Sequence, residues 1–312
     1  MSRQFIAEGY TVVAVSEYKN TLVRMLDMLW AVLRYRNSDY VLIDTYSTSG
    51  FWYAFFVSQL CRFLHLSYIP ILHGGNLPNR LEKNPKLCKM LFSNAYQNVA
   101  PSHYLMEAFT KAGFTNLTYI PNAIELANYP FKERKTIKPK LLWVRAFSYI
   151  YNPKMAVDVL NALQQHYPGA TLCMIGPEQD GSMATTKKYA EEKEVTVHFT
   201  GRLPKPDWLA LSSEYDIFIN TTHFDNTPVS VMEAMALGLP VVTTNVGGIP
   251  YLLEQEKDGL LVADGEVTAM VAAIERLLEQ PELALKLSQN ARTKATSWDW
   301  GQVKLQWKKL LE

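Results

Sequence analysis

The chain has 312 residues, which is enough for two domains that each bury a core. Hydrophobic residues make up 48% of it and charged residues 20%, as expected for an ordinary soluble globular protein. The most apolar segment, residues 50–72, is interrupted by Arg62 and His65, and this argues against a membrane-spanning helix. We expect no signal peptide at the start of the sequence. The three cysteines lack paired or metal-ligand spacing, so we expect them to be reduced and packed in a cytosolic protein.

The net charge of +1 conceals an asymmetry between the two parts of the chain. Residues 1–140 contain 16 Lys and Arg against 9 Asp and Glu, a net of +7, whereas the remainder has 15 against 21, a net of −6. A positive first part would attract an anionic membrane surface or a lipid-linked phosphate, although solvated surface charge is the plainer interpretation. No interleaving of aromatic and basic residues indicates a nucleic-acid partner.

The first part of the chain alternates helices and strands, which predicts a doubly wound α/β unit. The hydrophobic pattern favours helices over residues 3–8, 20–35, 51–64 and 102–112, and strands over 10–16, 40–44, 68–72 and 117–120, with a further strand ending at 100–101. The helix from Asn20 carries Trp30 between arginines. It is either a core helix or a helix that touches a membrane surface.

A charged, Pro-containing segment over residues 131–140 predicts a domain boundary, and a second alternation follows it. We expect strands over residues 141–144, 171–175, 196–199, 217–220, 239–244 and 260–262, and helices over 153–165, 183–194, 207–214, 229–237, 267–280, 282–295 and 298–311.

The stretch from Phe224 to Pro250 is the most informative part of the sequence. Thr227 is suited to cap a helix that Pro228 begins and Gly238 ends, because a missing N–H costs nothing in a first turn. The start of such a helix presents free N–H groups and a positive dipole end, which together bind phosphate. Carboxylates at Asp225 and Glu233 flank this start and suit sugar hydroxyls. The pattern therefore predicts a site for a nucleoside diphosphate sugar, with a generic βα turn as the alternative.

The same stretch resembles the acid-x7-acid signature of retaining glycosyltransferases of the group 1 type, carbohydrate-active family four. The resemblance implies that Glu233 binds the ribose of the nucleotide and that Asp225 lies against the donor sugar. The family usually has Glu-Gly where this chain has Asp225-Asn226, and a downstream Glu of the family is Tyr251 here. The resemblance further implies donor contacts from Asn226, Thr227, Pro228 and Val229.

Other site residues are implied by the same resemblance. Arg145 follows a predicted strand and corresponds to the family's phosphate-clamping Arg, with Lys154 as the candidate for its partner Lys. The segment FTGRL corresponds to the nucleobase contact, and HGGN to the loop that contributes to the sugar and acceptor site. The remaining candidates are Gly176, Gly201 and Arg202 on the donor side, and His73, Gly74, Gly75 and Asn76 on the acceptor side.

The implied architecture is the GT-B fold, two Rossmann-like doubly wound domains facing a cleft. We expect an acceptor-side domain over residues 1–137, a nucleotide-sugar domain over 138–296, and a C-terminal helix over 297–312 that crosses back to the first domain. Family members begin with a strand and a Gly-rich loop ahead of the segment AEGYTVVAVS, so we expect these elements to be absent from this chain.

The resulting hypothesis is metal-independent transfer of a sugar, with retention, from a nucleoside diphosphate sugar to a carbohydrate or lipid-linked acceptor in surface polysaccharide or glycolipid synthesis. Bond cleavage builds negative charge on the diphosphate, which cations and the helix start would stabilise. A catalytically silent nucleotide-sugar-binding protein or partner subunit, and a sugar-nucleotide epimerase on the same fold, are the alternatives. We expect a cytoplasmic protein, peripheral at the inner face of the cell membrane.

Overall fold

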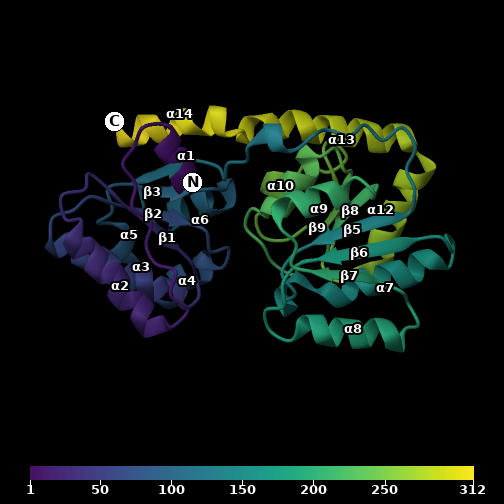
Figure 1. Cartoon of the computed structure of the whole chain (residues 1–312), viewed down its shortest axis with the longest axis horizontal. Coiled ribbons are helices and arrows are strands. Elements are labelled where there is room, and N and C mark those ends of the chain that lie inside the picture. The colour runs from purple at the N-terminus through teal and green to yellow at the C-terminus, as the bar shows by residue number, and fades with distance from the viewer. The chain divides into compact units, whose positions relative to one another are not determined.

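The computed structural model describes all residues, 1–312, and they form two compact units. Unit 1 consists of Met1–Ala123 together with Trp300–Glu312, and unit 2 of Ile124–Asp299. Each unit is a parallel β-sheet covered by helices, as Figure 1 shows for the labelled elements. The prediction of an α/β fold with two parallel-sheet domains is therefore confirmed.

Unit 1 has a four-stranded parallel sheet with the order β1-β2-β3-β4. Its elements in chain order are α1 (Ser2–Ala7), α2 (Thr21–Arg34), β1 (Val41–Thr45), α3 (Gly50–Phe63), β2 (Tyr68–Leu72), α4 (Leu77–Lys83), α5 (Pro85–Phe92), β3 (Asn98–Ala100), α6 (His103–Lys111), β4 (Leu117–Tyr119) and, after unit 2, α14 (Trp300–Leu311).

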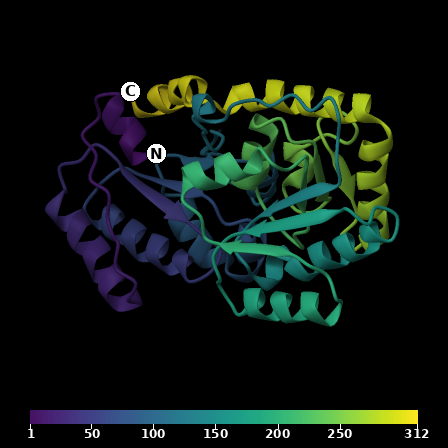
Figure 2. The same ribbon diagram turned by 45° about the vertical axis from the view of Figure 1, so that its right-hand side comes forward.

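Side chains of alternate sheet positions point to two separate cores, as expected for a buried parallel sheet. Tyr68 and Leu72 of β2 pack with α3, α4, α5 and α6, whereas Ile69 and Ile71 pack with α1 and α14. Phe5 of α1 meets Trp307 of α14 edge to face at 5.5 Å between ring centroids. Figures 1 and 2 both show α14 beside α1. The C-terminal helix therefore returns to the first unit, as predicted.

The predicted strand over residues 10–16 is wrong. The segment is extended but belongs to no sheet, and most of its side chains are exposed. A β-prone sequence forms a strand only where another strand offers backbone partners, and this segment has none. A cavity of about 670 Å³ lies between residues 13–18 and α2. Two helices that the sequence pattern did not predict, α4 and α5, follow β2.

Unit 2 has a six-stranded parallel sheet with the order β10-β9-β8-β5-β6-β7. Its elements are the 3-10 helix η1 (Leu126–Asn128), β5 (Lys140–Val144), η2 (Tyr149–Tyr151), α7 (Pro153–Gln164), β6 (Thr171–Ile175), α8 (Ser182–Glu192), β7 (His198–Gly201), α9 (Lys205–Ser212), β8 (Ile217–Asn220), α10 (Val229–Ala236), β9 (Val241–Thr244), α11 (Ile249–Leu252), β10 (Leu260–Val262), α12 (Val267–Glu279), α13 (Pro281–Ala295) and η3 (Thr296–Trp298).

This sheet also buries both faces. Leu141 and Trp143 of β5 pack against a core that includes α7 and α12, whereas Leu142 packs with α9 and α10. Figures 1 and 2 show α7 and α8 on one side of the sheet and α9 and α10 on the other. The chain first proceeds outwards from β5 to β7 and then returns to the other side of β5 to build β8, β9 and β10. The strand order reverses between β5 and β8, and ligands of such sheets bind at the carboxyl ends of the strands at this point.

Residues 124–137, which we assigned to the first domain, lie in the second compact unit. Arg134 explains this placement, because its buried guanidinium donates hydrogen bonds to the backbone carbonyls of Tyr215, Leu237 and Gly238 at 3.0–3.2 Å. These carbonyls belong to unit 2, so the charged segment is anchored there and does not act as a free linker.

Two further expectations concern composition. The three cysteines are unpaired and buried, and burial raises the pKa of the Cys61 thiol to about 12. The helices of the chain are all too short or too polar to cross a bilayer.

Candidate functional site

The candidate site lies where the strand order of unit 2 reverses. Arg145 directly follows β5, and the loop from Thr221 to Asp225 directly follows β8, the neighbouring strand. Gly176 and Gly201 stand at the ends of β6 and β7. Because all six strands are parallel, these residues share one edge of the sheet.

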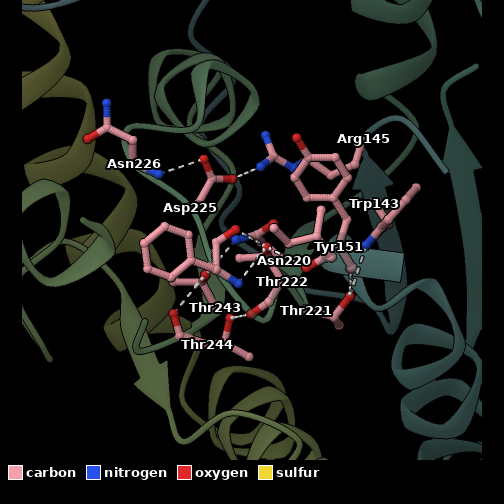
Figure 3. A network of polar contacts seen from close by, with 12 residues as sticks. Trp143, Arg145, Tyr151, Asn220, Thr221, Thr222, Asp225, Asn226, Thr243 and Thr244 are labelled. Carbon is pink, nitrogen blue, oxygen red and sulfur yellow. Dashed lines mark hydrogen bonds and ion pairs between the residues drawn. The ribbon is translucent and has the colours of Figure 1, made fainter. Parts of the chain in front are cut away.

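Arg145 and Asp225 form an ion pair at this edge, shown in Figure 3. The guanidinium lies 4.1 Å from the centre of the Tyr151 ring, and Asp225 Oδ1 accepts a hydrogen bond of 2.8 Å from the Asn226 N–H. Burial holds the pKa of the Arg145 guanidinium below its ordinary value. The Nε of Arg145 has no hydrogen-bond partner, so the cation retains a free donor.

A layer of buried polar side chains supports the loop over residues 221–225, here called the acidic loop, from beneath (Figure 3). Thr222 Oγ1 donates to the carbonyl of Phe224 at 2.8 Å, and Thr244 Oγ1 donates to the carbonyl of Thr222 at 2.6 Å. Thr221 Oγ1 accepts from Trp143 Nε1 at 3.1 Å. Buried and satisfied hydrogen bonds hold a loop in one conformation, so this layer positions Asp225 relative to Arg145.

The loop that carries Tyr151 is fixed by Asp180. Asp180 Oδ2 accepts hydrogen bonds from Ser148 Oγ at 2.7 Å and from the Tyr149 N–H at 3.0 Å. Hydrogen bonds from Ser182, Ser148 and the Tyr149 backbone lower the pKa of Asp180 to about 2. The segment between Arg145 and α7 is therefore an ordered wall of the site.

Two glycines allow the backbone to approach the acidic loop closely. A Cβ on Gly248 would lie 2.1 Å from the carbonyl oxygen of Asn226, and a Cβ on Gly247 would lie 2.2 Å from that of Asp225. The Gly248 N–H donates to the Asp225 carbonyl at 2.9 Å. Gly176 plays a similar part on the other side, since a Cβ there would lie 1.7 Å from the carbonyl oxygen of Arg145.

The first turn of α10 follows the acidic loop and is open. The N-cap is Pro228 and no side chain caps it, so the expectation that Thr227 would cap the helix is wrong. Val229 at the first helical position is exposed, and the buried Oγ of Ser230 has no hydrogen-bond partner. Leaving the first N–H groups uncapped keeps the donors and the positive dipole end available to an anion.

Glu233 lies in the second turn of α10 and is held by two residues that the sequence pattern did not indicate. Tyr129 donates a hydrogen bond of 2.8 Å to Glu233 Oε1, and Lys205 forms an ion pair with the same oxygen. The Lys205 amine also lies 4.9 Å from the ring centres of both Tyr129 and Trp208. Burial, with Glu233 beside it, raises the pKa of the Tyr129 phenol well above its ordinary value. One signal for Lys205 was present in the sequence, because Lys205 closely follows the Gly201-Arg202 turn that the resemblance assigns to the nucleobase contact.

Three donor-side candidates stand apart from this arrangement. Lys154 is exposed, and its amine lies 5.2 Å from the centre of the Tyr189 ring on α8, with no contact to Arg145 or Asp225. Arg202 is exposed and makes no ion pair. Gly201 has a positive φ of 69°, which favours glycine, but its position alone indicates no ligand contact. The roles assigned to these residues remain predictions.

The acceptor-side candidates lie in unit 1. His73 Nε2 is 2.9 Å from Asp44 Oδ1, and the His73 ring stacks on Tyr46 at 5.5 Å. The hydrogen bond with His73 lowers the pKa of the Asp44 carboxyl. Gly74 is buried against Ser47, whereas Gly75 and Asn76 lie at the start of α4, where Asn76 caps nothing with its side chain. The sequence pattern indicated His73 but not its carboxylate partner.

No group of three or more His, Cys, Asp or Glu side chains in the chain is arranged to hold a metal ion. Metal independence stays a prediction.

The fold and the site define a GT-B protein with an uncapped helix start between two acids. Comparison with known proteins gives the family of the chain. Residues 127–294 match the model of glycosyl transferases group 1, so the chain belongs to this family. Glycogen synthase from Mycobacterium tuberculosis is 30% identical over 196 residues, which are 61% of this chain and 47% of that protein. The amylovoran biosynthesis glycosyltransferase AmsK from Erwinia amylovora is 25% identical over 221 residues, 67% of this chain and 54% of that protein. The chain spans about half the length of these curated relatives.

Solved structures agree on the fold. Alr3699/HepE from Anabaena, in complex with UDP and glucose, has a TM-score of 0.80 at 18% identity and covers 99% of this chain and 88% of its own. Sucrose-phosphate synthase from Thermosynechococcus elongatus has a TM-score of 0.78 at 18% identity, covering 96% and 80%. The predicted family and the predicted GT-B fold are both confirmed.

Proposed function

We propose that the protein transfers a hexosyl group from a nucleoside diphosphate sugar to an acceptor hydroxyl with retention of anomeric configuration. The observation that carries the proposal is the uncapped start of α10 between Asp225, paired with the buried Arg145, and Glu233. A cation and a free helix start suit a diphosphate, and the carboxylates suit hydroxyl groups. The UDP and glucose in the HepE structure support a uridine nucleotide as the first donor to test.

In this proposal, the leaving diphosphate lies against the first turn of α10 and beside the Arg145 guanidinium. Negative charge grows on the diphosphate as the sugar leaves, so both groups bind the transition state more strongly than the ground state. Asp225 positions the donor sugar, and Glu233 accepts hydrogen bonds from the ribose. Lys205 and Tyr129 keep Glu233 in place through its Oε1 and leave Oε2 to the ligand.

We place His73 on the acceptor side, where the contact with Asp44 would orient its ring. Gly74, Gly75 and Asn76 would line the same side. The acceptor class is a carbohydrate or a lipid-linked saccharide of surface polysaccharide or glycolipid synthesis. The amylovoran biosynthesis relative supports this class.

The test is calorimetric titration of UDP-glucose, ADP-glucose and GDP-glucose into the native chain and into Arg145→Ala, Glu233→Ala and Lys154→Ala. We expect the first two variants to lose roughly 10- to 100-fold in affinity for the preferred donor, since a charge-assisted hydrogen bond contributes about 1.5–3 kcal/mol. Lys154→Ala tests the role that the resemblance implies for Lys154, and native affinity in this variant would leave the diphosphate to Arg145 and the start of α10.

The matched control is Lys188→Ala, which removes an exposed Lys of α8 outside the candidate site. Native affinity in both Arg145→Ala and Glu233→Ala would remove the donor-site proposal. Binding of all donors without transfer or hydrolysis would instead favour a silent nucleotide-sugar-binding subunit, and isomerised donor among the products would favour an epimerase.

A further inference from the structure

Unit 1 exposes a broad apolar face on helices α2 and α3. Leu22, Leu26 and Trp30 of α2 are 75%, 67% and 61% exposed, and Phe63 of α3 is 79% exposed. Scattered apolar side chains are normal on a surface, but these follow one another at helical spacing. The remaining exposed apolar residues of these two helices are Val23, Leu33, Trp52 and Phe56.

These side chains point away from the core of unit 1. On α2, the core is reached by Val32 with Met28 and Leu29, whereas Leu22 and Leu26 lie on another side of the helix. On α3, Phe51, Ala54 and Ser58 are buried and Trp52, Phe56 and Phe63 form a separate stripe at i, i+4 and i+11. Both views show α2 at the surface of unit 1 (Figures 1 and 2), and residues 13–18 run beside its Trp30 side.

The two helices are neighbours, and α5 continues the same layer beside α3. This layer is strongly positive. The three helices contain one acid, Asp27, against five cations, which are Arg24, Arg34, Arg62, Lys86 and Lys89. Met90 of α5, which is next to Lys89 in sequence, is also exposed. A face that combines Trp, Phe and Leu with Lys and Arg, and almost no acid, is complementary to an anionic bilayer.

We propose that the outer face of α2, α3 and α5 binds the surface of an anionic lipid bilayer, with Leu22, Leu26 and Phe63 inserted at the level of the head groups. The cations beside them would contact lipid phosphates, and the long Lys side chains would reach the head groups while their stems stay on apolar surface. The five cations against one acid give this face a charge complementary to anionic lipid phosphates, and this favours lipid as the occupant.

This inference goes beyond the proposed sugar transfer and does not depend on it. It assigns a surface of unit 1, whereas the donor site lies in unit 2. It also makes a lipid-linked acceptor accessible without a membrane-spanning helix.

The experiment is flotation of the purified chain with vesicles of phosphatidylcholine alone or of phosphatidylcholine with phosphatidylglycerol. We expect binding to the anionic vesicles at low salt and a clear reduction at high salt, because exposed charges are screened. The double variant Leu26→Gln with Phe63→Gln should bind about tenfold or more weakly, since each substitution removes an apolar side chain from the buried contact. Lys86→Gln with Lys89→Gln should weaken binding to anionic vesicles specifically.

The matched control is Leu305→Gln, which changes another exposed Leu, on α14. It should float as the native chain does. All substituted side chains are exposed, so circular dichroism and nucleotide affinity should stay native in every variant. Absence of vesicle binding at low salt, or binding that Leu26→Gln with Phe63→Gln leaves unchanged, would overturn the proposal. A native chain that dimerises through this face, with dimerisation lost in the double variant and no flotation, would also overturn it.

Discussion

At the scale of single residues, the ion pair between Arg145 and Asp225 creates a competition that bears on catalysis. The cation that would hold the diphosphate is already paired with the acid that would hold the sugar. A diphosphate adds negative charge beside Asp225, so part of the attraction of Arg145 for the donor is offset by repulsion. Removing the charge of Asp225 should therefore affect nucleotide binding and sugar transfer in opposite directions.

For Asp225→Asn, we expect affinity for the free nucleoside diphosphate to rise by about 1 kcal/mol, roughly fivefold, because Arg145 loses its competing partner. Sugar transfer should fall roughly 100-fold, because the donor sugar is no longer held in a reactive position. Calorimetry with the nucleotide and a transfer assay with the sugar donor measure the two effects separately. Equal losses in both assays would contradict the competition and indicate a disrupted loop.

A second prediction concerns the pair that holds Glu233. Lys205→Met and Tyr129→Phe should each weaken nucleotide binding by about 0.5–1.5 kcal/mol, because each removes a partner of Glu233 Oε1. Since both act through Glu233, neither should have a further effect when introduced into Glu233→Ala. Calorimetry on the single and double variants forms a double-mutant cycle. A full effect of Lys205→Met in the Glu233→Ala background would show instead that Lys205 binds the donor directly.

At the scale of elements, the site is assembled from turns that follow neighbouring strands. The turn after β9 packs its glycines onto the backbone of the acidic loop after β8. The loop after β5 carries Tyr151 onto Arg145 and is itself tied to the segment after β6 through Asp180. Because each of these loops contacts the next, a substitution in one turn should also alter the conformation of the neighbouring loop.

Gly248→Ala tests the first of these contacts. Gly248 has an ordinary φ of −85°, so only the 2.1 Å approach to the Asn226 carbonyl oxygen opposes a side chain. We expect a loss of about 1–3 kcal/mol in the free energy of unfolding, as for overpacking, together with weaker nucleotide binding. The matched control is Gly169→Ala, whose Cβ would have no neighbour within 4 Å. Denaturant unfolding measures both, and equal stability of the two variants would refute the contact.

The hydrogen bonds that Asp180 accepts predict that the free energy of unfolding depends on pH. Its pKa is lowered from an ordinary 3.8 to about 2, so its carboxylate stabilises the folded chain above about pH 4 and loses this effect as the pH falls towards 2. The difference in unfolding free energy between the native chain and Asp180→Asn should therefore be constant from pH 7 to about pH 4 and shrink below it. Urea unfolding at a series of pH values measures this difference. A difference that grows on acidification would contradict the assignment.

At the scale of the whole molecule, the regular parts of the fold were predictable from sequence and the contacts between distant segments were not. Buried parallel strands such as β2 and β6 have apolar patterns that identified them to the residue. Residues 10–16 have the same β-prone composition but no neighbouring strand, and pairing is a property of the sheet that local sequence does not contain. Helices α4 and α5 were not predicted, because each begins at a proline-containing turn and is only seven or eight residues long.

The candidate site shows the same division. Asp225, Glu233 and Arg145 were indicated by residue type next to a helix start or a strand end. Tyr129 lies 104 residues from Glu233 in sequence, and Lys205 lies 28 residues away, so their contacts follow only from how the elements pack. The resemblance implies a role for Lys154, whose amine lies beside the Tyr189 ring of α8, and this role stays a prediction.

A donor that binds only the folded protein must stabilise unit 2, which contains the site. By mass action, a donor at a hundredfold excess over its dissociation constant adds about 2.7 kcal/mol to the free energy of unfolding. For a unit of this size, such a gain raises the midpoint of thermal unfolding by roughly 5–10 °C. A thermal-shift screen of UDP-, ADP-, GDP- and TDP-sugars should therefore single out one nucleotide, and Glu233→Ala should abolish its shift. Lys188→Ala should retain the shift, because it changes only an exposed pair on α8. If no donor shifted the midpoint at millimolar concentration, the open start of α10 would have to serve some other anion.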